Sequence, residues 1–354
     1  MTSTYPINKR ESQAINLFKF FLTILVVFLH SYNDQLDLSL SDDIIHFETL
    51  QYIISQIICR CAVPSFFFIS GLLLYRKEFC WQENIIKKLH SLLIPYFIFN
   101  TFWIIFYALV QKVPFLSVFF SQPENVVTNW TFFDWVDKYI GFSGYPIVYP
   151  LWFIRDLFVL NIFATVIKKL VDRFPRIIFT VLILILIFNI KTNLFFFQEK
   201  NTIFFIWGYY AVKYKFKFEK LGQLRLSFLF PLCILTVLVD FITKDLSLHY
   251  LFRNASNIFC ALLLIRLSFL IIDCNKFKFF TTLGKYSFFI YCFHEMNLRI
   301  FKKIVTAIMP RNVLSYTFQY FSIAIIITTC CIILAMILEK YFPTIYKFIM
   351  GARN

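Results

Sequence analysis

The chain contains the segment INLFKFFLTILVVFLHSY at residues 15–32, an apolar stretch that carries one lysine and one histidine. A helix of about 20 residues crosses the hydrocarbon core of a bilayer, so this segment is long enough to span it. Similar segments recur along the 354 residues, and hydrophobic residues reach 59% while charged residues fall to 16%. In soluble domains, hydrophobic residues make up about 45–50% and charged residues about 25%. This composition predicts a multi-span membrane protein. It excludes a soluble globule, a disordered chain, a collagen, a coiled coil and a disulfide-stapled secreted module.

The apolar segments predict an all-α fold, a polytopic membrane helix bundle of about ten transmembrane helices. No internal repeat and no separate polar region interrupts the series, so we expect a single membrane-embedded domain over residues 1–354. Two of the segments, 177–190 and 202–214, are short for a full span. The predicted spans are residues 15–32, 52–75, 92–111, 152–171, 177–190, 202–214, 227–243, 254–272, 283–301 and 316–338.

The formal charge of +15 comes from lysines and arginines in short connections between the apolar segments. Such residues mark cytoplasmic loops, so we expect orientation signals and no nucleic-acid partner. Residues 33–51, the first connection, hold Asp34, Asp37 and three further acidic residues but no lysine or arginine. If this connection is external, the protein is a multi-pass membrane protein with both termini cytoplasmic. One connection breaks the pattern, because it would be external yet contains Arg299, Lys302, Lys303 and Arg311.

Polar residues form a stripe along the first predicted span. Lys19 and His30 are eleven residues apart. Eleven residues make about three helical turns, so the two side chains point within about 20° of each other and lie about 16 Å apart along the axis. Asn16, Thr23 and Asp34 fall close to the same line. A charge at the centre of a bilayer costs at least about 2.5–3.5 kcal/mol, so the stripe should face a cavity. Taken singly, Lys19 could instead snorkel to the headgroups, and His30 could be a hydrogen-bonded interfacial residue.

A second stripe lies on the ninth predicted span, where Ser287, Tyr291 and His294 follow at i, i+4 and i+7. His294 and Glu295 fall near the middle of the membrane, where an ionisable pair is a functional hypothesis by default, although a structural pair is the alternative. Because polar groups avoid lipid, we expect His294 and His30 to face one shared cavity.

Three further residues stand out on the second and fourth spans. Arg60 lies deep enough in its span to require an anion or a carboxylate. Trp152 suits an aromatic belt at the membrane interface. Arg155 is followed directly by Asp156, and adjacent residues on a helix point about 100° apart. We therefore expect this pair not to bond as i,i+4 neighbours do, and at least one member to contact another helix.

Five motifs, in this order, resemble acyltransferase family 3, whose membrane enzymes include bacterial O-acetyltransferases of surface polysaccharides. The resemblance covers nearly the whole chain, although Ser91 stands where many members have a second arginine. The motifs are the basic residue and histidine at Lys19 and His30, VPSFFFISGLLL (63–74) preceded by Arg60, KKLHSLLIPY (87–96), YPLWFIRDLFVL (149–160) and LGKYSFFIYCFH (283–294).

The resemblance implies transfer of an acyl group, acetyl in the simplest case, from acyl-CoA to a hydroxyl of a surface polysaccharide or lipid-linked sugar. His30 would be the general base or a transient acyl carrier, and Lys19 would stabilise negative charge. No zinc-type cysteine and histidine spacing is present, so no metal is expected. The residues expected to bind the substrate are Arg60, Trp152, Arg155, Tyr291 and His294. Lys87 and Lys88 are expected to bind acyl-CoA (acetyl-CoA). Alternatively, these two lysines serve only to set the orientation of the chain in the membrane.

A transporter or flippase for a glycan or lipid is the main alternative, because it would use the same polar cavity. Internal symmetry would favour a transporter, and the sequence shows none. A purely scaffolding membrane protein would leave both polar stripes unexplained. The sequence leaves open the acceptor sugar, the acyl chain and the oligomeric state.

Overall fold

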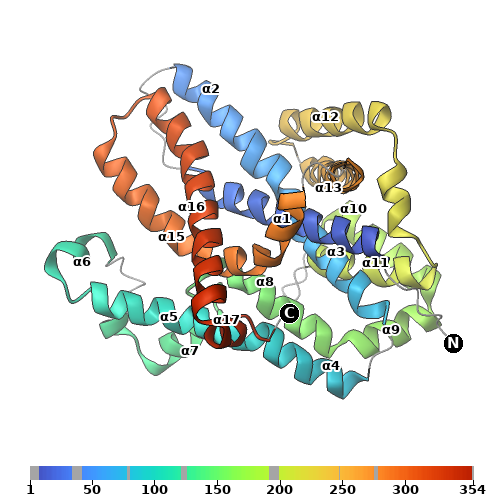
Figure 1. Cartoon of the computed structure of the whole chain (residues 1–354). Coiled ribbons are helices and arrows are strands. Elements are labelled where there is room, and N and C mark those ends of the chain that lie inside the picture. The colour runs from blue at the N-terminus through green and yellow to red at the C-terminus, as the bar shows by residue number, and fades with distance from the viewer. Residues whose placement is uncertain are drawn as a thin grey trace.

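The computed structural model describes residues 8–33, 42–77, 80–120, 126–190, 199–246, 248–274 and 278–352. Asp34 and Asp37, which the sequence places at or after the first span, lie outside the described residues. Every regular element among the described residues is a helix (Figure 1). The predicted all-α class is therefore confirmed.

Helix α1 (Lys9–Ser31) lies at the centre of the bundle and contacts α3, α13, α15 and α16 (Figure 1). It begins at Asn8, whose side chain accepts a hydrogen bond from the amide of Glu11 and so satisfies one otherwise unpaired donor of the first turn. The remaining helices are α2 (Asp42–Gln51), α3 (Ala62–Tyr75), α4 (Trp81–Lys88), α5 (Ile94–Val110), α6 (Pro114–Phe120), α7 (Phe132–Ile140), α8 (Trp152–Ile162), α9 (Ala164–Arg173), α10 (Pro175–Phe188), α11 (Glu199–Lys213), α12 (Leu226–Ile242), α13 (His249–Asp273), α14 (Lys278–Leu283), α15 (Ser287–Ile308), α16 (Val313–Tyr341) and α17 (Pro343–Ile349).

Each of the ten predicted spans lies on helix, but fewer than ten helices are long and apolar enough to cross a membrane. Among the described residues five qualify, or six if α8 and α9, which meet at a 58° bend, form one broken span. Helices α10 and α12 are shorter apolar helices. Helix α11 has 15 residues, and α15 carries several charged residues. The polytopic membrane bundle is confirmed, while the number of ten crossings stays a prediction. The five are Lys9–Ser31, Asp43–Tyr75, Trp81–Val110, His249–Cys274 and Val313–Tyr341.

The connection between α5 and α8 is rich in aromatic residues and packs as a cap on the bundle. It contains α6 and α7, and α7 ends at Gly141, whose φ of 71° is accessible to glycine at low cost. The hydroxyl of Tyr96 on α5 donates to the carbonyl of Tyr139 on α7. The amide of Ile147 donates to the carbonyl of Lys138 at 2.8 Å. The first bond holds the cap against α5, and the second closes the cap on itself.

Helices α3 and α11 approach so closely that two glycines lie at their contact. A methyl group on Gly208 would lie 2.4 Å from the carbonyl oxygen of Phe68 and 2.5 Å from the amide nitrogen of Leu72. Both are backbone atoms, which cannot rotate away. Small residues at such crossings let membrane helices pack tightly.

We expect Gly208→Ala to destabilise the protein by about 1–3 kcal/mol, as overpacking does. Thermal unfolding of the purified protein in detergent measures the effect. Gly144→Ala is the matched control, because no atom lies within 4 Å of a methyl group there. Equal unfolding temperatures for the two variants would contradict the tight contact.

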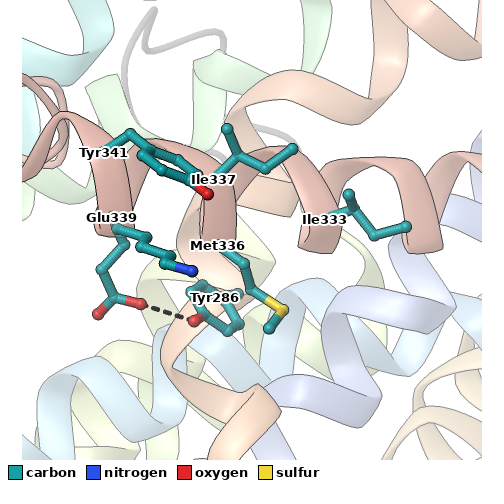
Figure 2. A pocket seen from close by; sticks show the side chains of 7 residues that line it. Tyr286, Ile333, Met336, Ile337, Glu339 and Tyr341 are labelled. Carbon is teal, nitrogen blue, oxygen red and sulfur yellow. Dashed lines mark hydrogen bonds between the residues drawn. The ribbon is translucent and has the colours of Figure 1, made fainter.

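A hollow of about 610 Å³ lies beside the C-terminal part of α16 (Figure 2). Its polar contact is the hydroxyl of Tyr286, which donates to Glu339 at 2.6 Å. Glu339 also bonds the ammonium of Lys285 at 2.7 Å. The hollow contains none of the predicted site residues. Its lining consists of Tyr286, Ile333, Met336, Ile337, Glu339, Lys340 and Tyr341.

Candidate functional site

Two histidines from distant parts of the chain meet at one end of the bundle. His30 lies in the last turn of α1, His294 lies on α15, and their ring centroids are 5.4 Å apart. His294 is fully buried, and its Nδ1 donates to the carbonyls of Tyr291 at 2.9 Å and Ile290 at 3.0 Å. Its Nε2 has no hydrogen-bond partner within the described structure. The two histidines are therefore neighbours, as expected, while the cavity that they are expected to share stays a prediction.

Glu295 completes a cluster with the two histidines. One carboxylate oxygen lies 3.4 Å from Nδ1 of His30, and the other accepts a hydrogen bond from Nε of Arg299 at 2.5 Å. The carboxylate is buried, whereas the His30 side chain stays 15% exposed. The carboxylate can therefore orient the imidazole and leave its Nε2 facing a ligand. The sequence pairs Glu295 with His294 as an intramembrane ionisable residue but does not assign it to the site.

Tyrosines of the segment before α8 line the approach to His30. The ring of Tyr149 lies 5.6 Å from that of His30, and Tyr145 lies 4.4 Å from Tyr149. Tyr145 is exposed, so the two rings connect the surface with the histidine. The sequence offers Tyr149 only as part of a family motif, since an aromatic residue in an aromatic-rich connection carries no signal of its own.

One nitrogen of each histidine and one oxygen of Glu295 lie within 4.8 Å of one another, a grouping that could hold a metal ion. The surroundings oppose a divalent cation. Arg60, Arg299 and Lys302 place positive charge close to His30, while Glu295 is the one anion acting on it. Like charges repel most strongly where water is scarce. The expected absence of a metal stays a prediction, and treatment with a chelator would test it.

The largest cavity described here lies toward the other end of α1, with a volume of about 1090 Å³. Lys19 and Thr23 line it, as do Phe153 and Tyr291. His30 does not, so the stripe on α1 serves two separate regions and not the one cavity that the sequence predicts. The basic residues in its lining are Lys19, Lys77, Lys87, Lys88 and His90.

Three aromatic rings close the cavity on the side of the histidines, and we call Phe66, Phe153 and Tyr291 the aromatic layer. The ring of Tyr291 lies 5.6 Å from that of Phe153, 6.5 Å from that of Phe66 and 6.2 Å from that of His294. Its hydroxyl donates to the carbonyl of Pro150. Tyr291 therefore borders both the cavity and the histidine cluster.

Arg60 lies in a 3₁₀ turn that joins a π-helical turn (Tyr52–Ile58) to α3. Its side chain is exposed and donates through Nε to the amide oxygen of Gln56 at 3.0 Å. Its charge acts on His30. The structure therefore brings Arg60 to the His30 end of the bundle.

Arg155 and Trp152 support the cap. The guanidinium of Arg155 donates to the carbonyls of Ile140 at 2.7 Å and Gly141 at 2.9 Å, which confirms the expected contact with another element. Arg155 also bonds its neighbour Asp156 at 2.9 Å. The adjacent residues thus bond in a different way from i,i+4 neighbours, because the long arginine side chain folds back to the carboxylate. Trp152 is buried against Phe153 and Tyr145, with ring centroids 6.5 Å from each.

Replacement of Lys19 by alanine is expected to raise the KM for acyl-CoA by about 10-fold to 100-fold, as loss of a charged hydrogen bond does. Lys19→Arg should retain part of the activity, because it keeps the charge but changes the geometry. Initial rates at varied acyl-CoA concentration measure both. Lys9→Ala, at an exposed position on the same helix, is the control. Near-normal rates in Lys19→Ala would favour the snorkelling interpretation.

Comparison with known proteins agrees with these observations. One relative is the succinoglycan biosynthesis protein ExoH of Rhizobium meliloti (strain 1021), which is 27% identical over 206 residues. That alignment covers 56% of this chain and 54% of ExoH, so the chain spans about half the length of this relative. No solved structure matches. The acyltransferase domain model of family 3 matches residues 12–336, which is most of the chain. The protein therefore belongs to acyltransferase family 3.

Proposed function

We propose that this protein transfers an acyl group, acetyl in the simplest case, from acyl-CoA to a hydroxyl of a surface polysaccharide or a lipid-linked sugar. Family membership implies an acyl-transfer enzyme, and the name of the relative supports a polysaccharide acceptor. The observation that carries the proposal is the contact of 3.4 Å between His30 and Glu295. It provides a histidine base oriented by a carboxylate at the end of α1 opposite to a large basic cavity.

The cavity suits the acyl-CoA donor. Its volume of about 1090 Å³ is at the upper end of the range of small-molecule sites, about 300–1,000 Å³. Lys77, Lys87 and Lys88 line it together with Lys19, and ammonium groups bind phosphates as point charges. Leu73 and other apolar residues in the lining would accept the less polar part of the donor. This arrangement supports the assignment of Lys87 and Lys88 to donor binding.

The reaction needs one base and one site of positive charge. His30 accepts the proton of the acceptor hydroxyl through Nε2 while the hydroxyl oxygen attacks the thioester carbonyl carbon. The C–O bond forms and the C–S bond breaks, and the departing thiolate of CoA takes the proton back from the imidazolium. Glu295 stabilises that imidazolium, and nearby cations stabilise the oxyanion. Because the cavity ends at the aromatic layer, the thioester has to reach past Tyr291 to meet His30.

We also propose that the protein lies in the cell membrane with both termini cytoplasmic and the cap external. The basic residues of the donor cavity then face the cytoplasm, where acyl-CoA is made and where lysines gather. A cysteine introduced at Ser143 in the cap should react with a membrane-impermeant thiol reagent added outside, and one at Lys217 should not. Both positions are exposed. The unaltered protein is the control, since it has exposed native cysteines such as Cys80. The opposite labelling pattern would invert the orientation.

Membranes that contain the protein, incubated with radiolabelled acetyl-CoA, test the enzymatic proposal directly. We expect label on glycan or lipid-linked sugar, and no such label with membranes that lack the protein. Label that stays on the protein would identify His30 as an acyl carrier. Translocation of glycan without any transfer of label would instead support a transporter.

A further inference from the structure

Basic side chains gather at the His30 end of the bundle. Arg60, Arg299 and Lys302, which we call the rim cations, all act electrostatically on His30. They come from two different elements, the 3₁₀ turn before α3 and the second half of α15. Arg299 and Lys302 belong to the connection that breaks the expected charge pattern. Their presence at this end therefore needs a reason other than membrane orientation.

The two arginines among the rim cations keep hydrogen-bond donors available near the histidine. Arg299 donates through Nε to Glu295, but within the described part of the chain its two Nη groups have no partner, and its side chain is 46% exposed. Arg60 is exposed and has Gln56 as its hydrogen-bond acceptor. Lys302 donates to the carbonyl of Tyr32 at 2.9 Å. His30, at 15% side-chain exposure, is reachable from the same side.

Neither known requirement of the proposed reaction accounts for all of these charges. The phosphates of acyl-CoA face cations of their own, because the donor cavity contains lysines at the far end of α1. Glu295 needs one counter-ion, and Arg299 supplies it. Asp240 is an anion that acts on Arg60 from a distance, but it is already paired with Arg253 and His249. Among the described residues, Arg60 and the outer nitrogens of Arg299 therefore make no ion pair of their own. Both guanidinium groups act on the same histidine, and arginines near one point form a strong site for phosphate or carboxylate.

We infer that the acceptor carries an anionic group, a phosphate or a carboxylate, close to the hydroxyl that is acylated, and that Arg60 and Arg299 bind this group beside His30. The inference rests on the proposed function and names the class of its acceptor, an anionic saccharide. A sugar joined to a lipid through a diphosphate has this chemistry, and so does a glycan that contains a uronic acid. Tyr149 and Tyr145 would pack against the sugar, because their rings lead from the surface to His30.

Equilibrium binding to the purified protein in a neutral detergent tests the inference. The probes are geranyl diphosphate, glucuronic acid and, as neutral counterparts, geraniol and methyl glucoside. We expect at least one anionic probe to bind more tightly than its neutral counterpart. Arg60→Gln and Arg299→Gln should each weaken that binding by about 10-fold to 100-fold, as loss of a charged hydrogen bond does, and Arg60→Lys should weaken it less. Preference for the diphosphate identifies a lipid-linked phosphate, and preference for glucuronic acid identifies a carboxylate on the sugar.

Arg311→Gln is the matched control, since Arg311 is an exposed arginine of the same connection. Arg60→Gln covers the case in which Arg299→Gln fails to fold. Equal binding of anionic and neutral probes, or equal weakening by Arg311→Gln, would overturn the inference. Acetyl-CoA binding, measured in the same preparations, separates the two proposals. Preference for an anionic probe without binding of acetyl-CoA would refute the proposed function and support the anion site. Binding of acetyl-CoA without a preference for anionic probes would refute the anion site and support the proposed function.

Discussion

Replacement of His30 by alanine is expected to lower the rate of acyl transfer by about 100-fold to 10,000-fold, the usual cost of losing a general base. The imidazole is the group that can accept the hydroxyl proton, and Glu295 lies 3.4 Å from its Nδ1. The side chain is small and 15% exposed, so the variant should still insert and fold. Transfer of labelled acetyl from acetyl-CoA to glycan, divided by the amount of protein in the membrane, measures the effect.

His46→Ala is the matched control for His30→Ala, because His46 is an exposed histidine on α2. It should transfer acetyl at the rate of the unaltered protein. Wild-type activity in His30→Ala would remove His30 from the mechanism and leave His294, whose Nε2 is unpartnered within the described structure, as the candidate base.

Glu295→Gln should lower kcat by about 10-fold to 100-fold, because the imidazolium formed in the reaction loses an opposite charge 3.4 Å away. Glutamine keeps the shape of the side chain and its contact with Arg299 but cannot stabilise an imidazolium. The KM for acyl-CoA should stay unchanged, because Glu295 does not line the donor cavity. Loss of the carboxylate should not unfold the protein, since the Arg299 side chain is 46% exposed and can be solvated by water.

Glu295 is a positioning residue in this scheme, and a double variant tests that role. In the His30→Ala background, Glu295→Gln should cause almost no further loss, because residues that act as one unit are not additive. Glu295→Asp should recover part of the rate by restoring the charge. A full additional loss in the double variant would show that Glu295 acts independently of His30.

The helical repeat explains why half of the site can be predicted from the sequence. Eleven residues separate Lys19 and His30, so one face of α1 holds both, and the cost of polar groups in lipid turns that face inward. The same reasoning on α15 places His294 opposite His30, and their rings are 5.4 Å apart. These predictions need only the local geometry of a single helix and the solvent around it.

The other half of the site depends on contacts between helices that no local pattern encodes. Phe66, Phe153 and Tyr291 come from α3, α8 and α15 and form a layer only once those helices pack. The sequence therefore predicts one cavity where the structure has two regions. Glu295 directly follows His294, and only the packed structure shows that both reach His30.

The number of membrane crossings shows a similar limit. Each predicted span lies on helix, but hydropathy evaluates each segment alone and misses short helices such as α2 and α7. Helix α15 can hold Glu295 because other helices surround its first half. It is not among the helices that are long and apolar enough to span a membrane. Helices α8 and α9 read as one segment in the sequence and bend by 58° at Phe163. A helix buried by protein and a helix surrounded by lipid are both apolar in sequence. Only the helix buried by protein accepts ionisable residues that have partners on neighbouring helices.

In the proposed membrane orientation, the aromatic layer would also have an electrical role. An open water path from the donor cavity to the His30 cluster would allow protons to cross, and each elementary charge that crosses dissipates about 2.3 kcal/mol per 100 mV of membrane potential. The cavity instead ends at Phe66, Phe153 and Tyr291, and the hydroxyl of Tyr291 is fixed to the carbonyl of Pro150. These rings lie between the donor cavity and His294. They would therefore limit the passage of water and protons, while a narrow acyl chain would need only a small gap between them.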